Sequence, residues 1–112
     1  MPLRSIAVRA HNIDAMRAFY AAAFGFRFAP MEIGPLQCWF GEADGLTLKL
    51  VPMRDAADFE SYPLHQLGFT VADIAAVMEY ARVHGGAIES ADGARASVRD
   101  PDGNTIELSQ VT

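Results

Sequence analysis

The chain lacks several features that would assign it to a class at once. Of its 112 residues only one, Cys38, is a cysteine, which excludes an intrachain disulfide and a thiolate metal cluster. Nine lysine and arginine residues stand against 14 aspartate and glutamate residues. The resulting net charge of −5 argues against anionic partners such as nucleic acid or a membrane surface. No long apolar run occurs, so we expect no signal peptide, no transmembrane helix and a cytoplasmic protein.

What is present fits a single folded domain spanning residues 1–112. Apolar residues make up 51% of the chain and charged residues 21%, an ordinary balance for a soluble protein. A chain of this length suits one domain with one sizeable core.

The chain contains an internal repeat. Residues 44–50 read DGLTLKL and residues 102–108 read DGNTIEL, so the same pattern occurs twice with Lys49 replaced by Glu107. Earlier in each copy an offset of 61 residues aligns Ser5 with Gln66, and at the C-terminal ends the offset is 58. Repeats of this kind predict two copies of one structural unit.

Each copy is predicted to fold as strand, helix and three further strands. Alternating apolar residues predict strands at 5–10, 26–28, 36–41 and 46–51, then at 66–71, 87–89, 94–99 and 104–109. Asn12 and Asp73 are predicted N-caps, Gly25 is predicted to end the first helix, and Gly85 and Gly86 are predicted to end the second. We expect module one at 4–51, a linker at 52–64 and module two at 65–112.

The strands are predicted to turn a polar face away from the helices. The residues that alternate with the core set are Ser5, Ala7, Arg9, Thr47, Lys49, Gln66, Gly68, Thr70, Ser97, Arg99, Thr105, Glu107 and Ser109. Because a packed interior would be aliphatic, this polar lining predicts a small-molecule pocket.

Three stretches carry a family resemblance. The duplicated βαβββ unit, the passage from Phe19-Tyr20 to Gly25-Phe26 and the run DPDGNTIEL at 100–108 resemble the vicinal oxygen chelate superfamily. That superfamily includes glyoxalase I, extradiol dioxygenases, and fosfomycin- and bleomycin-resistance proteins. The resemblance implies an α+β fold in which two βαβββ modules form a partly open, barrel-like cavity. It also implies a homodimer.

The resemblance implies four metal-ligand positions, which this sequence fills only in part. Ligands in the family are His or Gln on the first strand of each unit and Glu on the last strand. Here those positions hold Ser5, Lys49, Gln66 and Glu107. Glu107 matches, Gln66 is a weak oxygen ligand, and Lys49 would repel a cation. We therefore expect no tightly bound metal, with a divalent metal at Glu107 and Gln66 as the alternative.

Lys49 suggests what replaces the metal. A buried carboxylate needs a partner, and we hypothesise that Lys49 or Arg9 forms an internal ion pair with Glu107. The candidate catalytic residue is Glu107, and the candidate pocket residues are Ser5, Arg9, Lys49, Gln66, Arg99 and Trp39. The basic members favour an anionic ligand and Trp39 an aromatic one, although ion pairing and core packing explain them equally well.

The remaining candidates are interpreted as structural. His11, His65 and His84 have no metal-ligand spacing, and Cys38 is read as a packed thiol. Phe59 and Tyr62 in the linker are expected to mark a binding surface or interface.

Two functions follow from these residues. The first is a small-molecule-binding protein of the bleomycin-resistance kind, which sequesters a ligand without reaction. The alternative is a lyase or dioxygenase with an atypical or partner-completed metal site. A metal-free enzyme would use Glu107 as a base, with Lys49 or Arg9 stabilising an enolate.

Overall fold

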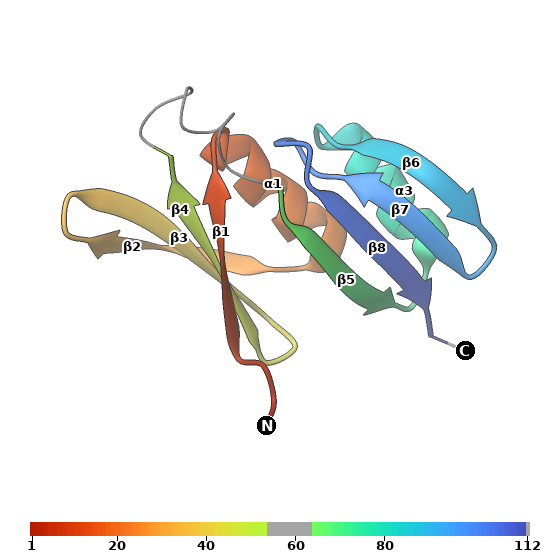
Figure 1. Ribbon diagram of the computed structural model, residues 1–112, viewed down its shortest axis with the longest axis horizontal. Helices are drawn as coiled ribbons and strands as arrows, with labels where there is room; N and C mark the ends of the chain where they lie inside the picture. The colour runs from red at the N-terminus through yellow and green to blue at the C-terminus, as the bar shows by residue number, and fades with distance from the viewer. Residues whose placement is uncertain (54–63, 112) are drawn as a thin grey trace.

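The computed structural model describes residues 1–53 and 64–111 and contains two copies of one β-α-β-β-β unit (Figure 1). The first comprises β1 (Ser5–Ala10), α1 (Ile13–Phe24), β2 (Arg27–Ile33), β3 (Leu36–Ala43) and β4 (Leu46–Pro52). The second comprises β5 (Gln66–Val71), α3 (Ile74–Val83), β6 (Ala87–Asp92), β7 (Arg95–Arg99) and β8 (Thr105–Gln110). Most of the expected linker, with Phe59 and Tyr62, lies outside the described residues.

The two sheets have the same topology. Their strand orders are β1-β4-β3-β2 and β5-β8-β7-β6, and in each the first and last strands of the unit pair in parallel. Ala7 lies opposite Lys49 in the first sheet, and Gly68 lies opposite Glu107 in the second. The repeat predicted from the sequence is therefore confirmed, and Lys49 and Glu107 occupy equivalent positions.

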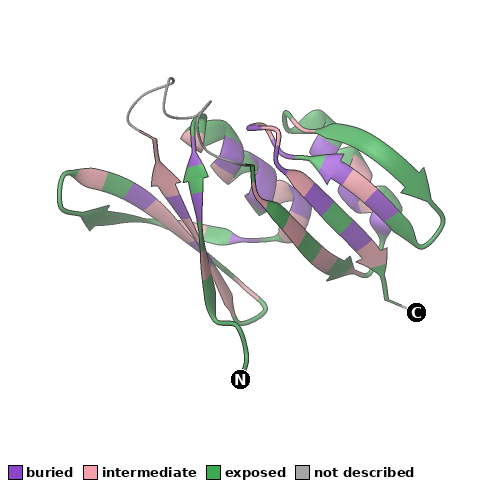
Figure 2. Cartoon of the chain, viewed as in Figure 1, coloured by how far each residue is buried: buried purple, intermediate pink, exposed green. Residues whose placement is uncertain are grey.

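The core lies between the sheets and the two helices. Figure 2 shows buried and exposed residues alternating along β7 and β8, as expected for strands with one covered face. One cluster of buried residues draws on both modules: Val8, Met16, Phe19, Tyr20, Leu48 and Leu50 from the first, and Ile74, Val77, Val98, Ile106 and Leu108 from the second. The helices also contact each other, so the modules share a core.

The helix ends agree with the sequence at three of four predicted caps. Asp73 caps α3 by accepting a hydrogen bond from the Ala76 amide at 3.2 Å. Gly25 ends α1 with φ of 75°, a left-handed conformation that glycine adopts without strain, and Gly86 follows α3 with its amide bonded to the Ala81 carbonyl. Asn12 precedes α1, but its side chain makes no capping hydrogen bond.

The start of α1 is held instead by the Asp100–Asn104 turn of module two. The Asp102 carboxylate accepts hydrogen bonds from the His11 amide at 2.7 Å and the Asn12 amide at 3.0 Å. The side-chain oxygen of Asn104 accepts one from the His65 amide at 2.8 Å. A stretch that reads as a simple turn in the sequence therefore joins the two modules.

The predicted fold class is confirmed: the chain is α+β and built of two βαβββ modules. The two sheets are not closed into a barrel, because each forms hydrogen-bonded strand pairs only within itself. In the part of the chain that the structure describes, neither sheet pairs with the other, and we call the polar face of each sheet its open face. Neither helix in the described ranges is long and apolar enough to cross a membrane.

Candidate functional site

The open face of the second sheet carries the strongest candidate site. We call it the Glu107 face; its side chains are those of Gln66, Thr70, Ser97, Arg99, Thr105, Glu107 and Ser109. The side-chain amide of Gln66 donates a hydrogen bond to the Glu107 carboxylate at 2.7 Å. A hollow of about 370 Å³ lies over this face and includes Glu107 in its lining. The two residues predicted from the repeat are thus brought together.

Several hydroxyl groups line the hollow. The hydroxyl oxygens of Thr70 and Ser109 lie 3.4 Å apart on neighbouring strands. Ser97 lies opposite Glu107 in the register of β7 and β8. Each hydroxyl can donate and accept hydrogen bonds. The lining therefore suits a ligand with several polar atoms, and an exposed Glu107 is accessible to it.

Two further charged residues of the hollow, Asp92 and Arg95, were not among the sequence candidates. They lie opposite each other on β6 and β7. The strand was predicted to start at residues 87–89 with no end assigned, so the place of Asp92 on a sheet face was not apparent. The signal that would have found it is the continued polar alternation after Glu89.

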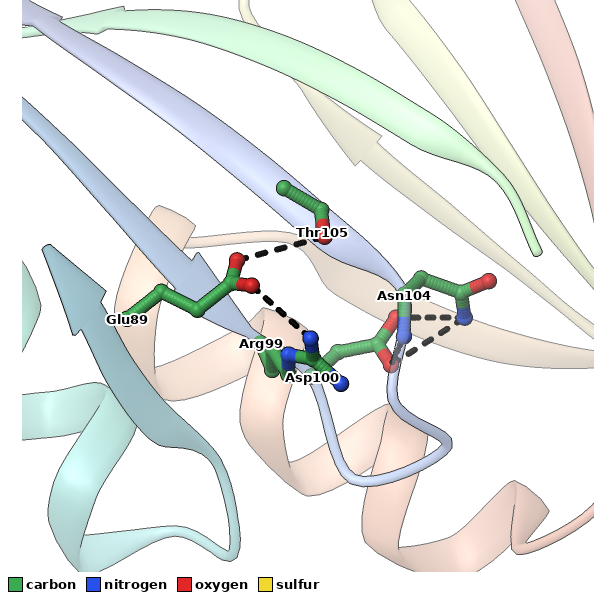
Figure 3. A network of polar contacts seen from close by, with 5 residues as sticks. All are labelled: Glu89, Arg99, Asp100, Asn104 and Thr105. Atoms are coloured by element: carbon green, nitrogen blue, oxygen red, sulfur yellow. Dashed lines mark hydrogen bonds and ion pairs between the residues drawn. The ribbon is translucent and has the colours of Figure 1, made fainter.

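Arg99 lies at the end of β7, where its charge is balanced (Figure 3). Its guanidinium contacts the Glu89 carboxylate at 2.9 Å, and the Thr105 hydroxyl donates to the same carboxylate at 3.2 Å. The pairing of β6 with β7 shifts register between Ile88 and Ser90, which leaves Glu89 as the extra residue of a bulge. The contact with Glu89 balances the charge of Arg99, so this arginine is not available as an unpaired cation.

The open face of the first sheet, which we call the Lys49 face, carries Ser5, Arg9, Phe40, Glu42, Thr47 and Lys49. The Lys49 ammonium lies 5.1 Å from the centre of the Phe40 ring, within range of a cation–π contact. Among the described residues the ion pairs are Arg17–Asp14, Arg82–Glu79 and Arg99–Glu89. Lys49 therefore does not form the hypothesised ion pair with Glu107 inside one chain.

Trp39 is placed on the opposite side of the first sheet from the candidate pocket residues. It lies across from buried Leu50 in the register of β3 and β4, and residues directly opposite share a face. Its ring packs against the core, and the Arg17 guanidinium lies 3.9 Å from the ring centre. Trp39 is therefore not brought together with Glu107.

The donor set on the Glu107 face does not fit a metal centre within one chain. Only Glu107 and Gln66 supply oxygen donors at the expected positions, and the equivalent positions of module one hold Ser5 and Lys49. No group of three His, Cys, Asp or Glu side chains with metal-binding geometry occurs in the described part of the chain. Two protein oxygens are too few for a stable site, so we derive no chemical step through a metal.

Comparison with known proteins finds solved structures that share this fold. The chain is similar to TnmS3, an antibiotic-binding protein from Streptomyces sp. CB03234, with 22% identity and a TM-score of 0.72 over 100% of this chain and 97% of that one. Glyoxalase I of Leishmania major has 21% identity and a TM-score of 0.75, covering 98% and 86% of the two chains. The fosfomycin resistance protein FosX of Listeria monocytogenes has 14% identity and a TM-score of 0.79, covering 99% and 91%.

These likenesses show the fold, and the family model is more specific. No curated protein matches the chain in sequence. The model of the Glyoxalase/Bleomycin resistance protein/Dioxygenase superfamily matches residues 3–108, which is nearly the whole chain. The chain therefore belongs to the Glyoxalase/Bleomycin resistance protein/Dioxygenase superfamily.

Proposed function

We propose that this protein binds a small molecule on the Glu107 face and does so without a tightly bound metal. The observation that carries the proposal is Glu107, which accepts a hydrogen bond from Gln66 and lines a hollow of about 370 Å³ together with the hydroxyl groups of Thr70, Ser97 and Ser109. That volume lies within the range of about 300–1,000 Å³ typical of ligand pockets. A solved structure with the same fold, TnmS3, is an antibiotic-binding protein, which supports the same kind of function.

Within this proposal Glu107 accepts hydrogen bonds from the ligand. Gln66 occupies one carboxylate oxygen of Glu107 and fixes its orientation, which leaves the other oxygen for a ligand donor. Ser97 and Ser109 add neutral donors and acceptors beside it. A ligand that presents hydroxyl or amide groups fits this surface, and an unpaired anion placed directly against Glu107 does not.

We further propose that a second copy of the chain covers this face. Positions that the repeat makes equivalent carry opposite charges twice: Lys49 corresponds to Glu107, and Glu42 corresponds to Arg99. If the Lys49 face of one copy packs on the Glu107 face of another about a local two-fold axis, only positions close to that axis meet their equivalents, and we propose that Lys49 and Glu107 lie close to it. Lys49 would then neutralise the Glu107 of the partner, which accounts for the reversed charge.

A second candidate function is a metal-dependent lyase or dioxygenase. The observation that favours it is the contact of Gln66 with Glu107, because these are the two positions at which family ligands are expected. The second copy would have to supply further donors, and the face that would approach presents Lys49. The residues of the site therefore favour a small-molecule-binding protein over a metal-dependent enzyme.

The test is a thermal-shift titration combined with elemental analysis of protein purified without chelators. Ligands would include bleomycin and a panel of small molecules that carry hydroxyl or amide groups, with anionic fosfomycin as a comparison that should bind less well, and the metals would be Ni²⁺, Co²⁺, Mn²⁺, Fe²⁺ and Zn²⁺. A compound that binds only the folded state raises its melting temperature by mass action. We expect a shift with a small molecule, loss of that shift in Glu107→Gln, and no stoichiometric metal.

The control variant is Glu79→Gln, which removes an exposed carboxylate on α3, outside the sheet that carries Glu107. It should leave every shift unchanged. About one metal ion per chain that disappears in Glu107→Gln would instead establish the metal-dependent candidate. Shifts that persist in Glu107→Gln would place the ligand elsewhere on the molecule.

A further inference from the structure

A second hollow, of about 550 Å³, lies at the seam between the two modules. We call it the seam groove; its lining includes Phe24, Phe26, Leu46, Phe69, Val71 and Ala76, with Asp44 and Asp73 among its polar residues. The end of α1 and the turn between β3 and β4 form one wall, and β5 with the start of α3 forms the other. It shares β5 with the Glu107 face but contains neither Gln66 nor Glu107.

Aromatic rings give the seam groove an apolar surface. The rings of Phe24 and Phe69 stack with centres 4.3 Å apart and planes 23° apart, and Phe26 meets Phe69 edge-on at 6.2 Å. Phe24 and Phe69 are only half-buried, so part of each ring faces solvent. Such surfaces attract another aromatic ring, because offset-stacked and edge-on pairs add to the gain from burial.

The charges of the seam groove all have one sign. Its ionisable lining residues are Asp44 and Asp73, and no lysine, arginine or histidine lies in the lining given by the described residues. Asp44 is exposed, on the turn between β3 and β4, and makes no hydrogen bond or ion pair with another described side chain. Asp73 already uses one oxygen to cap α3. The groove therefore attracts a cation and repels an anion.

We propose that the seam groove binds a small aromatic amine. The ring lies against Phe24 and Phe69, and the ammonium group pairs with Asp44. The amino-terminal end of α3 disfavours a cation beside Asp73, since the helix dipole is positive there. Asp44 is therefore the main charged contact and Asp73 the lesser one. This inference concerns a separate hollow and does not rest on the function proposed for the Glu107 face.

The experiment follows amide chemical shifts of the full chain by NMR while three matched probes are added. Phenethylamine is cationic, phenethyl alcohol is neutral and hydrocinnamate is anionic, and all three carry the same phenyl group and two-carbon arm. We expect phenethylamine to bind most tightly and hydrocinnamate least. The shifted amides should include those of Asp44, Val71 and Ala76, which line the seam groove and not the hollow over the Glu107 face.

Two variants remove the charges and keep the local backbone. Asp44 has φ of 48°, which asparagine also tolerates, so Asp44→Asn should fold normally. Asp73→Ser keeps an oxygen that can cap α3. We expect Asp44→Asn to weaken phenethylamine binding about two- to fivefold, as for an exposed ion pair. Asp73→Ser should weaken it less, and neither variant should change the affinity for phenethyl alcohol.

The matched control is Asp92→Asn, which removes a carboxylate from the Glu107 face. It should leave phenethylamine affinity unchanged. The proposal is overturned by equal affinity for hydrocinnamate, by an Asp44→Asn variant that binds the amine as tightly as the parent, or by shifts confined to the Glu107 face. Absence of any phenethylamine binding at millimolar concentration would also overturn it. Failure of the small-molecule function on the Glu107 face would leave all of these readouts unaffected.

Discussion

At the scale of single residues, Asp100 is the most constrained carboxylate described in the chain. Only 3% of its surface is exposed, and it accepts hydrogen bonds from the Tyr20 hydroxyl at 2.8 Å, the Asn104 amide at 2.9 Å and the Asp102 amide at 3.0 Å. Burial raises the pKa of Asp100, although the hydrogen bonds from Asn104 and Tyr20 act in the opposite direction. Burial also raises the pKa of Tyr20, and the nearby Asp100 charge adds to that effect.

The raised pKa of Asp100 predicts how stability changes with pH. The ordinary pKa is 3.8, so the stability that Asp100 contributes is fully present below that pH and is lost as pH rises through the folded-state value. The Asp100→Asn variant has no such titration. We therefore expect the parent's advantage in unfolding free energy over Asp100→Asn to be largest in acid and to shrink as pH rises.

Urea unfolding of the parent and of Asp100→Asn at a series of pH values measures this difference in unfolding free energy. The contributions of titrating groups that both proteins share cancel in the difference. An advantage that grows with pH would mean that hydrogen bonding outweighs burial at Asp100. Below the pKa the size of the advantage should be about 1–3 kcal/mol, the cost of leaving buried polar groups such as the Tyr20 hydroxyl or Asn104 amide poorly paired.

At the scale of secondary-structure elements, the connection from α3 to β6 requires a residue without a side chain at Gly86. A Cβ atom added to Gly86 would collide with the Arg99 carbonyl oxygen and would lie 2.6 Å from the Phe19 ring and 3.0 Å from the Ala81 carbonyl. Phe19 belongs to α1 and Arg99 to β7, so this one position lets three elements from both modules approach.

We predict that Gly86→Ala destabilises the protein by about 1–3 kcal/mol, the usual cost of an overpacked core position. Denaturant unfolding monitored by circular dichroism measures the loss. Gly68→Ala is the matched control, because a Cβ there meets nothing nearer than the Glu107 carbonyl oxygen at 4.0 Å. If Gly86→Ala and Gly68→Ala lower the unfolding free energy equally, the close packing around Gly86 is not the reason that a glycine is needed there.

At the scale of the whole molecule, the described part of the chain combines a shared core with two polar sheet faces. The Asp100–Asn104 turn and the contact of α1 with α3 join the two modules. The Lys49 face and the Glu107 face carry reversed charges at equivalent positions. This arrangement is what the proposed homodimer would complete.

We predict that reversing one of these charges weakens the dimer and that reversing both restores it. In Lys49→Glu, two carboxylates would meet at the interface, and like charges placed opposite each other cost several kcal/mol. The dimer dissociation constant should therefore rise at least about tenfold. The double variant Lys49→Glu with Glu107→Lys should recover most of the affinity.

Sedimentation velocity over a range of concentrations measures both effects, and low salt sharpens them because exposed charges are less screened. The charge reversal Glu79→Lys, on α3, serves as the control and should leave association unchanged. Restoration that fails in the double variant would show that Lys49 and Glu107 do not face each other between chains.

The roles predicted for the candidate site stay predictions, and the structure shows only how its residues are arranged. The family resemblance singled out Gln66 and Glu107, and the structure joins them by a hydrogen bond. The bulge at Glu89 was not predictable, because a bulge inserts one residue without a distinctive sequence signal. Trp39 lies on the covered face because β3 pairs with β4 in a register that alternation within β3 alone does not fix.

The sequence by itself determined the two modules, their order of elements and the alternation that separates core from polar face. These follow from local patterns: the period of apolar residues, the turn residues and the repeat. Only the tertiary structure decided which residues meet across the chain. Contacts such as His11 with Asp102, or Phe24 with Phe69, join positions far apart in sequence, and they depend on how the two modules pack against each other. The same packing keeps Lys49 from forming an ion pair with Glu107 inside one chain, and no local sequence pattern encodes that separation.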